Sequence, residues 1–287
     1  MSVEAPREVS DSALTRVANL VFDVGLHRGE DTAFYLALGY DVVAFEADPD
    51  HAAFCRERFA EEIAGGRLRI IEGVIAPPGR DSVTFYRSLS HSPWGTTEAE
   101  WASRRAHASE FVAVEIPTVD FADALRRHGV PHFLKIDIEG ADLFCLEQLE
   151  AFPARPRFVS IESDKFDRAA VRAEFDLLER LGYGRFAVIQ QGSIPGTLLD
   201  TVDRDGNPMR YRFEKESSGP FGTDIGSWES RERCEQRYDR IFVAYRIFGE
   251  RGLLRRTRTG QRIAVRLPRY KGVRVPGWHD THAMLTE

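Results

Sequence analysis

Residues 18–49 read ANLVFDVGLHRGEDTAFYLALGYDVVAFEADP. Two apolar runs in this stretch, Leu20–Phe22 and Val42–Phe45, have the composition of buried strands, and a helix-like stretch, Glu30–Leu38, lies between them. A turn with two glycines joins the first run to the helix-like stretch. The order strand, glycine turn, helix, strand is that of the first half of a nucleotide-binding unit, so it predicts an α/β fold.

The turn and the acidic residue that ends the second run indicate where a ligand binds. Gly25 and Gly29 lack a Cβ, so the chain can turn tightly and a ligand can approach the backbone closely. The helix that follows begins with unpaired N–H groups, which attract a polar or anionic group. Glu46 can accept hydrogen bonds from both hydroxyls of a ribose. We therefore expect a nucleoside-containing cofactor beside this turn.

The composition of the turn separates two classes of cofactor. Dinucleotide oxidoreductases have the pattern G-x-G-x-x-G, whose crowded glycines admit a pyrophosphate. Here the turn reads GLHRG over residues 25–29, and the bulky His27 stands where the middle glycine would be. This difference favours a nucleoside ligand without a diphosphate, of which S-adenosylmethionine is the common one. A nicotinamide-dependent oxidoreductase is the alternative.

The rest of the chain continues the alternation of strands and helices. Asp48 is expected to cap a helix over residues 49–63, with Pro49 at its first position. Further strands are expected at residues 68–71, 83–86, 111–116, 132–138, 158–161, 185–190 and 240–245. Further helices are expected over residues 166–181 and in a segment that ends near His128. This alternation predicts a doubly wound, largely parallel sheet.

Acidic residues stand at the carboxyl ends of four expected strands, namely Asp23, Glu46, Asp137 and Glu162. Open α/β sheets bind ligands beyond these ends, so the four carboxylates predict a polar site at that edge. In the strand 132–138, the charged Lys135 and Asp137 alternate with apolar residues, and Glu139 follows in the same alternation. Charges in a buried strand are costly unless they are paired or used, so this strand is a candidate for function.

Composition excludes several classes of protein. No apolar run approaches the ~20 residues that a membrane span needs, and the polar first residues do not resemble a signal peptide. The three cysteines, Cys55, Cys145 and Cys234, are far apart, which favours buried reduced thiols in a cytoplasmic protein. No cluster of His, Cys and Asp has zinc-ligand spacing, so no metal is predicted.

Basic residues are concentrated at the end of the chain. The net charge is −6, yet residues 246–287 hold ten Lys or Arg against three Asp or Glu. A patch for nucleic acid or a membrane surface is one interpretation. Because the rest of the chain is acidic and the tail lacks interleaved aromatic residues, we favour a tail that folds back on its own or a neighbouring subunit, or that holds an anionic substrate. A homo-oligomer is left open.

Three stretches resemble the FkbM-type methyltransferases. They are Phe22–Gly25 with Gly29 and Thr32, Ala44–Pro49 (AFEADP) and Phe133–Asp142 (FLKIDIEGAD). The string L-K-I-D-x-E-G-A-[DE] is the specific part, whereas many class I methyltransferases share the glycine turn. The resemblance covers residues 18–190 and 239–245, and VEIPTVDF at 114–121 fits it as well.

The resemblance implies a class I methyltransferase (Rossmann-like) fold with a mostly parallel, seven-stranded sheet. It also implies S-adenosylmethionine as methyl donor, S-adenosylhomocysteine as product, and O-methylation of a hydroxyl on a sugar, glycan or natural product. Carried over by position, Asp23, Gly25 and Gly29 would line the methionine end of the cofactor, and Glu46 would hold the ribose. The other residues of the expected cofactor site are His27, Thr32, Ala47, Asp48 and Asp137.

Methyl transfer to a hydroxyl also requires a group that accepts the hydroxyl proton. Asp137 is the first candidate for this base, followed by Glu139 and His91, and Lys135 is expected to orient the acids. Structural roles compete: an ion pair with Lys135 would equally explain Asp137, and helix capping would explain Glu139. His27 is either a contact to the cofactor or acceptor or a solvated loop residue.

Two long irregular segments are expected to bind the acceptor, because the residues that recognise it must come from loops above the edge of the sheet. They are residues 88–110, with Trp94 and Trp101, and residues 191–236, with Trp228. Along the chain we expect an N-terminal extension at 1–17, a methyltransferase domain at 18–246 with these two insertions, and a basic C-terminal extension at 247–287. Besides methyltransferase and oxidoreductase, a nucleic-acid-binding or nucleic-acid-modifying protein is the third function class.

Overall fold

The computed structural model describes residues 15–77, 79–88, 110–138, 141–249, 252–257, 269–270, 273–275 and 277–286. The chain divides into two compact units. The first comprises Met1–Val159 with Leu199–Tyr211, and the second comprises Ser160–Leu198 with Arg212–Glu287.

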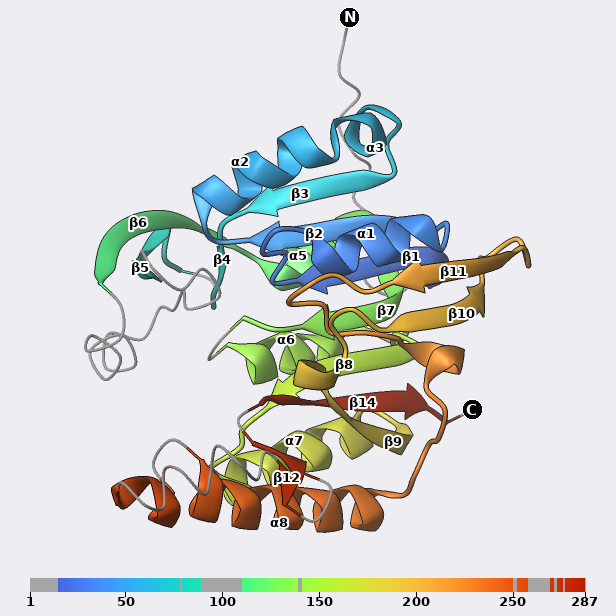
Figure 1. Cartoon of the computed structure of the whole chain (residues 1–287). Coiled ribbons are helices and arrows are strands. Elements are labelled where there is room, and N and C mark those ends of the chain that lie inside the picture. The colour runs from blue at the N-terminus through green and yellow to red at the C-terminus, as the bar shows by residue number, and fades with distance from the viewer. Residues whose placement is uncertain are drawn as a thin grey trace, which may run out of the picture. The chain divides into compact units, whose positions relative to one another are not determined.

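The first unit holds most of the parallel strands and the N-terminal helices (Figure 1). Its elements are β1 (Arg16–Val24), α1 (Glu30–Ala37), β2 (Asp41–Glu46), α2 (Pro49–Arg58), α3 (Ala60–Ala64), β3 (Leu68–Glu72), β4 (Val74–Ile75), β5 (Ser82–Ser88), β6 (Phe111–Val119), α5 (Phe121–His128), β7 (Val130–Ile136), α6 (Asp142–Gln148) and the 3₁₀ turn Leu149–Ala151. The hairpin of β10 (Leu198–Val202) and β11 (Pro208–Arg212) belongs almost wholly to this unit.

The second unit holds the last strands and two longer helices. Strand β8 (Phe158–Ser163) crosses from the first unit into it. Its other elements are α7 (Arg168–Arg180), β9 (Tyr183–Gln190), α8 (Arg231–Phe248), β12 (Arg269–Tyr270), β13 (Val273–Arg274), β14 (His279–Leu285) and the 3₁₀ turns Gln191–Ser193, Gly222–Asp224 and Leu253–Arg256.

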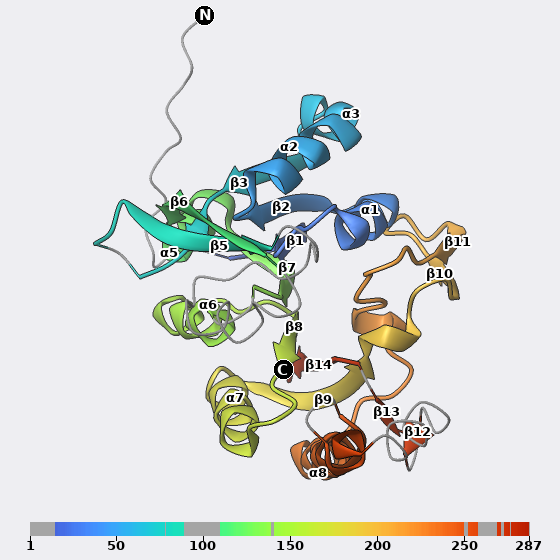
Figure 2. The same ribbon diagram turned by 60° about the vertical axis from the view of Figure 1, so that its left-hand side comes forward.

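The main sheet confirms the predicted fold class. Its seven strands follow the order β3-β2-β1-β7-β8-β14-β9. In the first unit, β1 pairs in parallel with β2 and β7, and β2 pairs in parallel with β3. Figure 2 shows α1 on one face of these strands and α5 and α6 on the other, as in a doubly wound sheet. In the second unit, β14 runs antiparallel to β9.

Apolar side chains of the central strands form the core of the first unit. Val21, Phe22 and Val24 of β1 are fully buried, and so is Leu134 of β7. Phe22 packs its ring against those of Phe45 and Phe121, which lie on β2 and α5. This packing and the pairing of β1 with β2 and β7 hold the carboxyl ends of the three strands together. The residues that follow these ends form the candidate site.

The expected strand over residues 240–245 is wrong, because these residues lie within helix α8. The short run IFVAY has strand-like composition, yet Ile241, Ala244, Tyr245 and Phe248 are buried at helical spacing while Val243 is exposed. The stripe continues backward through Tyr238 and Cys234, so the helix buries one face over its whole length.

The last strand of the sheet is instead β14, which reads HDTHAML and lies within residues 247–287. Sequence patterns gave no reason to expect a strand there, because its first four residues are polar. All four are nonetheless buried. The expected helix over residues 49–63 is divided at Phe59 into α2 and α3, and the remaining expected strands and helices are present with shifted ends. All three cysteines are buried and free. Within the described ranges, no helix is long and apolar enough to cross a membrane.

Candidate active site

The glycine turn after β1 takes the conformation that its composition predicts. Gly25 and Gly29 have φ angles of 96° and 80°, which side chains rarely tolerate. A Cβ on Gly25 would lie 2.0 Å from the carbonyl oxygen of Asp137, so only glycine lets the ends of β1 and β7 approach this closely. His27 also has a positive φ of 52°, which is uncommon for a residue with a side chain.

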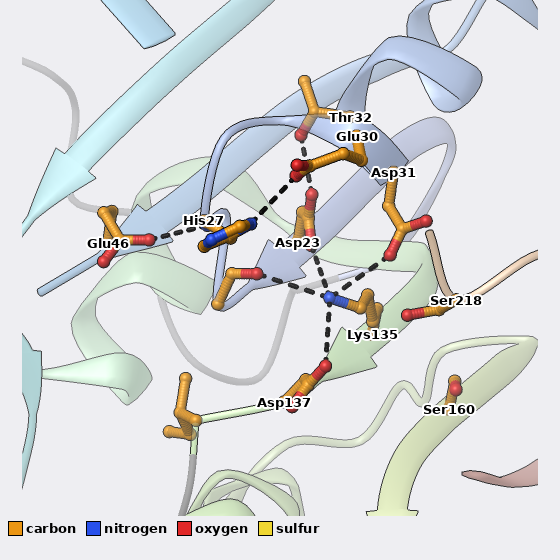
Figure 3. Close-up of polar contacts among 12 residues, drawn as sticks. Asp23, His27, Glu30, Asp31, Thr32, Glu46, Lys135, Asp137, Ser160 and Ser218 are labelled. Atoms are coloured by element: carbon orange, nitrogen blue, oxygen red, sulfur yellow. Dashed lines mark hydrogen bonds and ion pairs between the residues drawn. The ribbon is translucent and has the colours of Figure 1, made fainter. Parts of the chain in front are cut away.

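The carboxylate of Glu46 is held by two backbone donors. Its Oε2 accepts a hydrogen bond of 2.7 Å from the N–H of His27, and its Oε1 accepts one of 2.8 Å from the N–H of Asp48. Each oxygen keeps one lone pair for a further donor. Burial raises the pKa of Glu46 to about 7, although the two backbone hydrogen bonds favour the charged form. Figure 3 shows this carboxylate beside the turn that carries His27.

Asp48 caps helix α2, as predicted, and anchors the strand β5. Its Oδ1 accepts a hydrogen bond of 2.9 Å from the N–H of Asp50, and its Oδ2 accepts one of 2.7 Å from Nε of Arg87 on β5. Arg87 also pairs with Asp50. The neighbouring Ala47 packs against an apolar cluster that includes Phe85 of β5. The β5–β6 arm is therefore fastened to the segment that follows Glu46.

Three carboxylates surround one buried ammonium at the ends of β1 and β7. Lys135 Nζ lies 3.5 Å from Oδ1 of Asp23, 3.4 Å from Oδ2 of Asp31 and 3.7 Å from Oδ2 of Asp137. It also donates a hydrogen bond of 3.3 Å to the carbonyl of Gly25. Figure 3 shows Lys135 between these groups. The alternating charges of the 132–138 strand are thus paired rather than exposed.

Asp23 is the most deeply buried member of this cluster. Its Oδ2 accepts a hydrogen bond of 2.7 Å from the hydroxyl of Thr32. Its Oδ1 lies 3.5 Å from Nζ of Lys135 and accepts no hydrogen bond within the part of the chain that the structure describes. Burial raises the pKa of Asp23 to about 6, and the charge of Lys135 opposes this shift. Because the described cluster has three carboxylates for one ammonium, it favours a cationic ligand.

Two histidines, His27 in the glycine turn and His51 on helix α2, lie near each other and near acidic residues. Nδ1 of His27 is 3.1 Å from Oε2 of Glu30, and the ring of His27 meets that of His51 edge to face at a centroid distance of 4.7 Å. Nδ1 of His51 lies 4.0 Å from Oε1 of Glu46. His27 is therefore a packed member of the turn rather than a solvated loop residue, and its backbone N–H orients Glu46.

Sequence reasoning missed Asp31, Glu30, His51 and Arg87. Asp31 could have been found, because it stands in the first turn of the helix that follows the glycine turn, where acidic residues gather. Arg87 could not, since its partner Asp48 is 39 residues away and no local pattern links them.

The predicted acceptor and base residues have different outcomes. Glu139, His91, Trp94 and Trp101 lie outside the described residues, as do nearly all residues of the 88–110 segment. Trp228 is half-buried and precedes Glu229, which forms a β-bridge with Phe186 in the middle of β9. No group of three or more His, Cys, Asp or Glu within the described part of the chain is arranged to hold a metal ion.

Comparisons with known proteins bear on this geometry. Residues 23–184 match the Methyltransferase FkbM domain family. Among curated proteins, the chain is 40% identical over 77 residues to the probable ribosomal RNA small subunit methyltransferase A of Haloarcula marismortui, a match that covers 27% of this chain and 26% of that protein. The chain thus spans about a quarter of the length of this curated relative.

Several solved methyltransferases are distantly similar. The precorrin-6Y C5,15-methyltransferase of Geobacter metallireducens is 12% identical with a TM-score of 0.35, over 70% of this chain and 78% of that one. An O-methyltransferase of Bacillus cereus in complex with S-adenosylhomocysteine is 14% identical with a TM-score of 0.32, over 67% and 71%. The O-methyltransferase TomG of Streptomyces achromogenes, in complex with S-adenosylmethionine, is 15% identical with a TM-score of 0.33, over 67% and 70%.

Proposed function

The chain belongs to the FkbM family of S-adenosylmethionine-dependent methyltransferases, and from this premise we propose that it methylates a hydroxyl group on a sugar, glycan or natural product. The observation that carries the proposal is the pair of carboxylates at the ends of β1 and β2. Glu46 is held by two backbone N–H groups with one lone pair left on each oxygen. Asp23 has a buried oxygen that accepts no hydrogen bond from the described residues.

These two acids match opposite ends of the cofactor. Two free lone pairs on adjacent carboxylate oxygens suit the two neighbouring hydroxyls of a ribose, so Glu46 is the residue that would hold the adenosine end. The buried carboxylate of Asp23 suits an ammonium group, so Asp23 would hold the methionine end, beside Gly25 and Gly29. The excess of negative charge around Lys135 also complements the sulfonium.

The other proposed cofactor contacts position these two. Thr32 fixes the orientation of Asp23 through its hydroxyl. The backbone N–H groups of His27 and Asp48 fix Glu46, while Ala47 seats this segment against the β5–β6 arm. Asp137 contributes its carbonyl, which packs against Gly25 and sets the width of the turn.

S-Adenosylmethionine supplies, when bound, a methyl group on a sulfur that is an excellent leaving group. The protein must then align the hydroxyl and remove its proton. Asp137 is our candidate for the base, because it follows β7 directly and is the most exposed of the three carboxylates around Lys135. Lys135 would orient Asp137 through the ion pair and would share its ammonium with Asp23 and Asp31. Glu139 and His91 are the other candidate bases.

The reaction class is tested with the purified chain, S-adenosylmethionine labelled with tritium in the methyl group, and a panel of hydroxylated sugars and phenols. We expect label in an acceptor as an acid-stable, base-stable methyl ether, and S-adenosylhomocysteine as the second product. Label on nitrogen or carbon, with none on oxygen, would exclude O-methylation while leaving the family assignment intact.

RNA is a second candidate acceptor, because the curated relative with 40% identity over 77 residues is named as a ribosomal RNA methyltransferase. The net charge of −6 speaks against RNA. The same labelling assay with small-subunit ribosomal RNA decides between the two. Incorporation into RNA that exceeds incorporation into every small acceptor would favour the second candidate.

A further inference from the structure

One face of strand β5 contacts the segment that follows β2. Strand β5 pairs antiparallel with β6, and Figure 1 shows these two strands beyond the carboxyl ends of β2 and β3. Phe85 and Arg87 are two residues apart, so their side chains lie on the same face of β5. Phe85 belongs to the apolar cluster against which Ala47 packs, and Arg87 pairs with Asp48 and Asp50. The contact between β5 and this segment is therefore both apolar and ionic.

Asp48 takes part in three hydrogen bonds that fix its backbone and its side chain. Its N–H donates to Oε1 of Glu46 over 2.8 Å. Its Oδ1 accepts from the N–H of Asp50 over 2.9 Å, and its Oδ2 accepts from Nε of Arg87 over 2.7 Å. The bond to Asp50 is the local cap of helix α2, whereas Arg87 is 39 residues away in the sequence. Arg87 thus supplies the tertiary contact to the residue whose N–H orients Glu46.

The ion pair between Arg87 and Asp48 is largely removed from water. The Arg87 side chain is 25% exposed and that of Asp48 is 12% exposed, so the charged hydrogen bond is stronger than one at the surface. Among the described residues, Arg87 is the only cation within ion-pair distance of Asp48. Without Arg87, Asp48 would be a nearly buried carboxylate with no cation beside it, which is costly. We expect Asp48 to shift toward water in that case.

The charge of Asp48 also acts on Glu46. Burial is the main cause of the raised pKa of Glu46, and the charge of Asp48 adds to it. The Arg87 guanidinium lies against Asp48 and offsets this charge. Because an ionised carboxylate can only accept hydrogen bonds, it is the form of Glu46 that suits two ribose hydroxyls. Arg87 therefore favours both the position and the charge state that ribose binding requires.

We propose that Arg87 is a positioning residue for the recognition of the cofactor ribose, and that it acts through Asp48 on Glu46. Arg87 holds Asp48 so that its N–H stays on Oε1 of Glu46, and the other lone pair of that oxygen keeps its direction. This role needs no contact between Arg87 and the cofactor. The inference rests on the proposed function, because it requires that Glu46 binds the ribose.

A double-mutant cycle tests whether Arg87 acts through Glu46. Calorimetry with the full chain measures the affinity for S-adenosylhomocysteine in the wild type, Arg87→Met, Glu46→Ala and the double variant. Arg87→Met should weaken binding roughly tenfold in the wild-type background. In the Glu46→Ala background it should weaken binding less than about twofold, because the ribose contact that Arg87 orients is already lost there.

Two further variants separate positioning from a general loss of structure. Arg87→Lys keeps a cation beside Asp48 but not the planar guanidinium, so its affinity should lie between those of Arg87→Met and the wild type. Arg56→Met is the matched control and should leave the affinity unchanged, because Arg56 on α2 pairs over 2.7 Å with Glu72 of β3. Circular dichroism checks that each variant is folded, and Arg87→Gln takes the place of Arg87→Met in the cycle if the latter does not fold.

The outcomes distinguish this inference from the proposed function. If Arg87→Met weakens binding equally in both backgrounds, or not at all in the wild-type background, the positioning role is refuted. The ribose would stay assigned to Glu46 as long as Glu46→Ala alone weakens binding. An unchanged affinity in folded Glu46→Ala would refute the placement of the cofactor and, with it, the role of Arg87.

Discussion

Glu46 is a buried acid whose pKa lies well above that of an exposed glutamate. Burial raises its pKa to about 7, while the backbone N–H groups of His27 and Asp48 favour the carboxylate. Each oxygen of the Glu46 carboxylate accepts one backbone hydrogen bond and keeps one lone pair for a ligand, so the group is preorganised for binding. Such preorganisation lowers the stability of the protein when the ligand is absent. The same trade-off applies to Asp23, whose pKa is raised to about 6.

The raised pKa of Glu46 predicts how the free energy of unfolding changes with pH. A carboxyl whose pKa is higher in the folded state than in the unfolded state binds its proton more tightly when folded. The free energy of unfolding therefore falls as pH rises from the unfolded value of 4.5 to about 7, by about 3 kcal/mol for this residue alone. Glu46→Gln carries no charge at any pH, so it should remove this fall of stability with pH.

Urea unfolding at pH 5 and pH 8 measures this difference. Glu61→Gln, on the surface of α3, is the control and should keep the slope of the wild type with pH. If Glu46→Gln has the same pH dependence as the wild type, Glu46 is not a strained acid in the free protein.

Asp137 gives the second prediction at this scale. Asp137→Asn keeps the shape of the side chain and removes the base, so turnover should fall by roughly 10²–10⁴-fold. The affinity for S-adenosylmethionine should fall much less, because two of the three carboxylates around Lys135 remain. Single-turnover kinetics and calorimetry separate the two effects, and circular dichroism checks the fold. Loss of turnover that is explained by unfolding would leave Asp137 with a structural role as an ion-pair partner of Lys135.

At the scale of elements, the glycine turn was predictable because its chemistry is local. Gly25 and Gly29 both have a positive φ angle, which favours glycine, and their spacing after an apolar run is visible in the sequence. Glu46 was predictable for the same reason. Lys135 was expected as a partner of the acids, but Asp31 was missed, and the link from Arg87 to Asp48 depends on a tertiary contact.

Helix α8 and strand β14, in contrast, could not be predicted from the local sequence. The run IFVAY in α8 favours a strand locally, yet the burial of one face over Arg231–Phe248 makes it a helix. The run HDTH in β14 has no apolar pattern, and some of its buried polar side chains bond with residues that are distant in sequence. For example, Thr281 contacts the hydroxyl of Tyr238, and Asp280 accepts a hydrogen bond from Ser160. Such partners are distant in sequence, so periodicity could not reveal them.

The turn itself is tested by two alanine substitutions. Gly25→Ala places a Cβ 2.0 Å from the carbonyl oxygen of Asp137, so the turn must move and S-adenosylmethionine binding should be lost. Gly66 also has a positive φ but has nothing within 4 Å of the added Cβ, so Gly66→Ala should cost only the backbone strain of roughly 1–2 kcal/mol. Cofactor affinity and thermal unfolding of both variants check this. Equal effects on affinity would mean that the close approach at Gly25 has no functional part.

At the scale of the whole molecule, the charge of the first unit bears on the proposed cofactor. Three carboxylates surround the single ammonium of Lys135 there, an excess of negative charge that would complement a cationic cofactor. The cofactor loses its sulfonium charge on methyl transfer. S-Adenosylmethionine should therefore bind more tightly than S-adenosylhomocysteine at low salt, and added salt should reduce the difference.

Competition calorimetry with the two compounds at two salt concentrations measures this charge effect. Equal affinities at both concentrations would show that the carboxylates around Lys135 do not sense the sulfonium.

Calorimetry of S-adenosylmethionine with the wild type and with Glu46→Ala tests the cofactor assignment most directly. The wild type should bind one molecule per chain, and the variant should bind more weakly by about 1.5–3 kcal/mol because paired hydrogen bonds to the ribose are lost. Circular dichroism must show that the variant is folded. An unchanged affinity in folded Glu46→Ala would contradict the placement of the cofactor at the ends of β1 and β2.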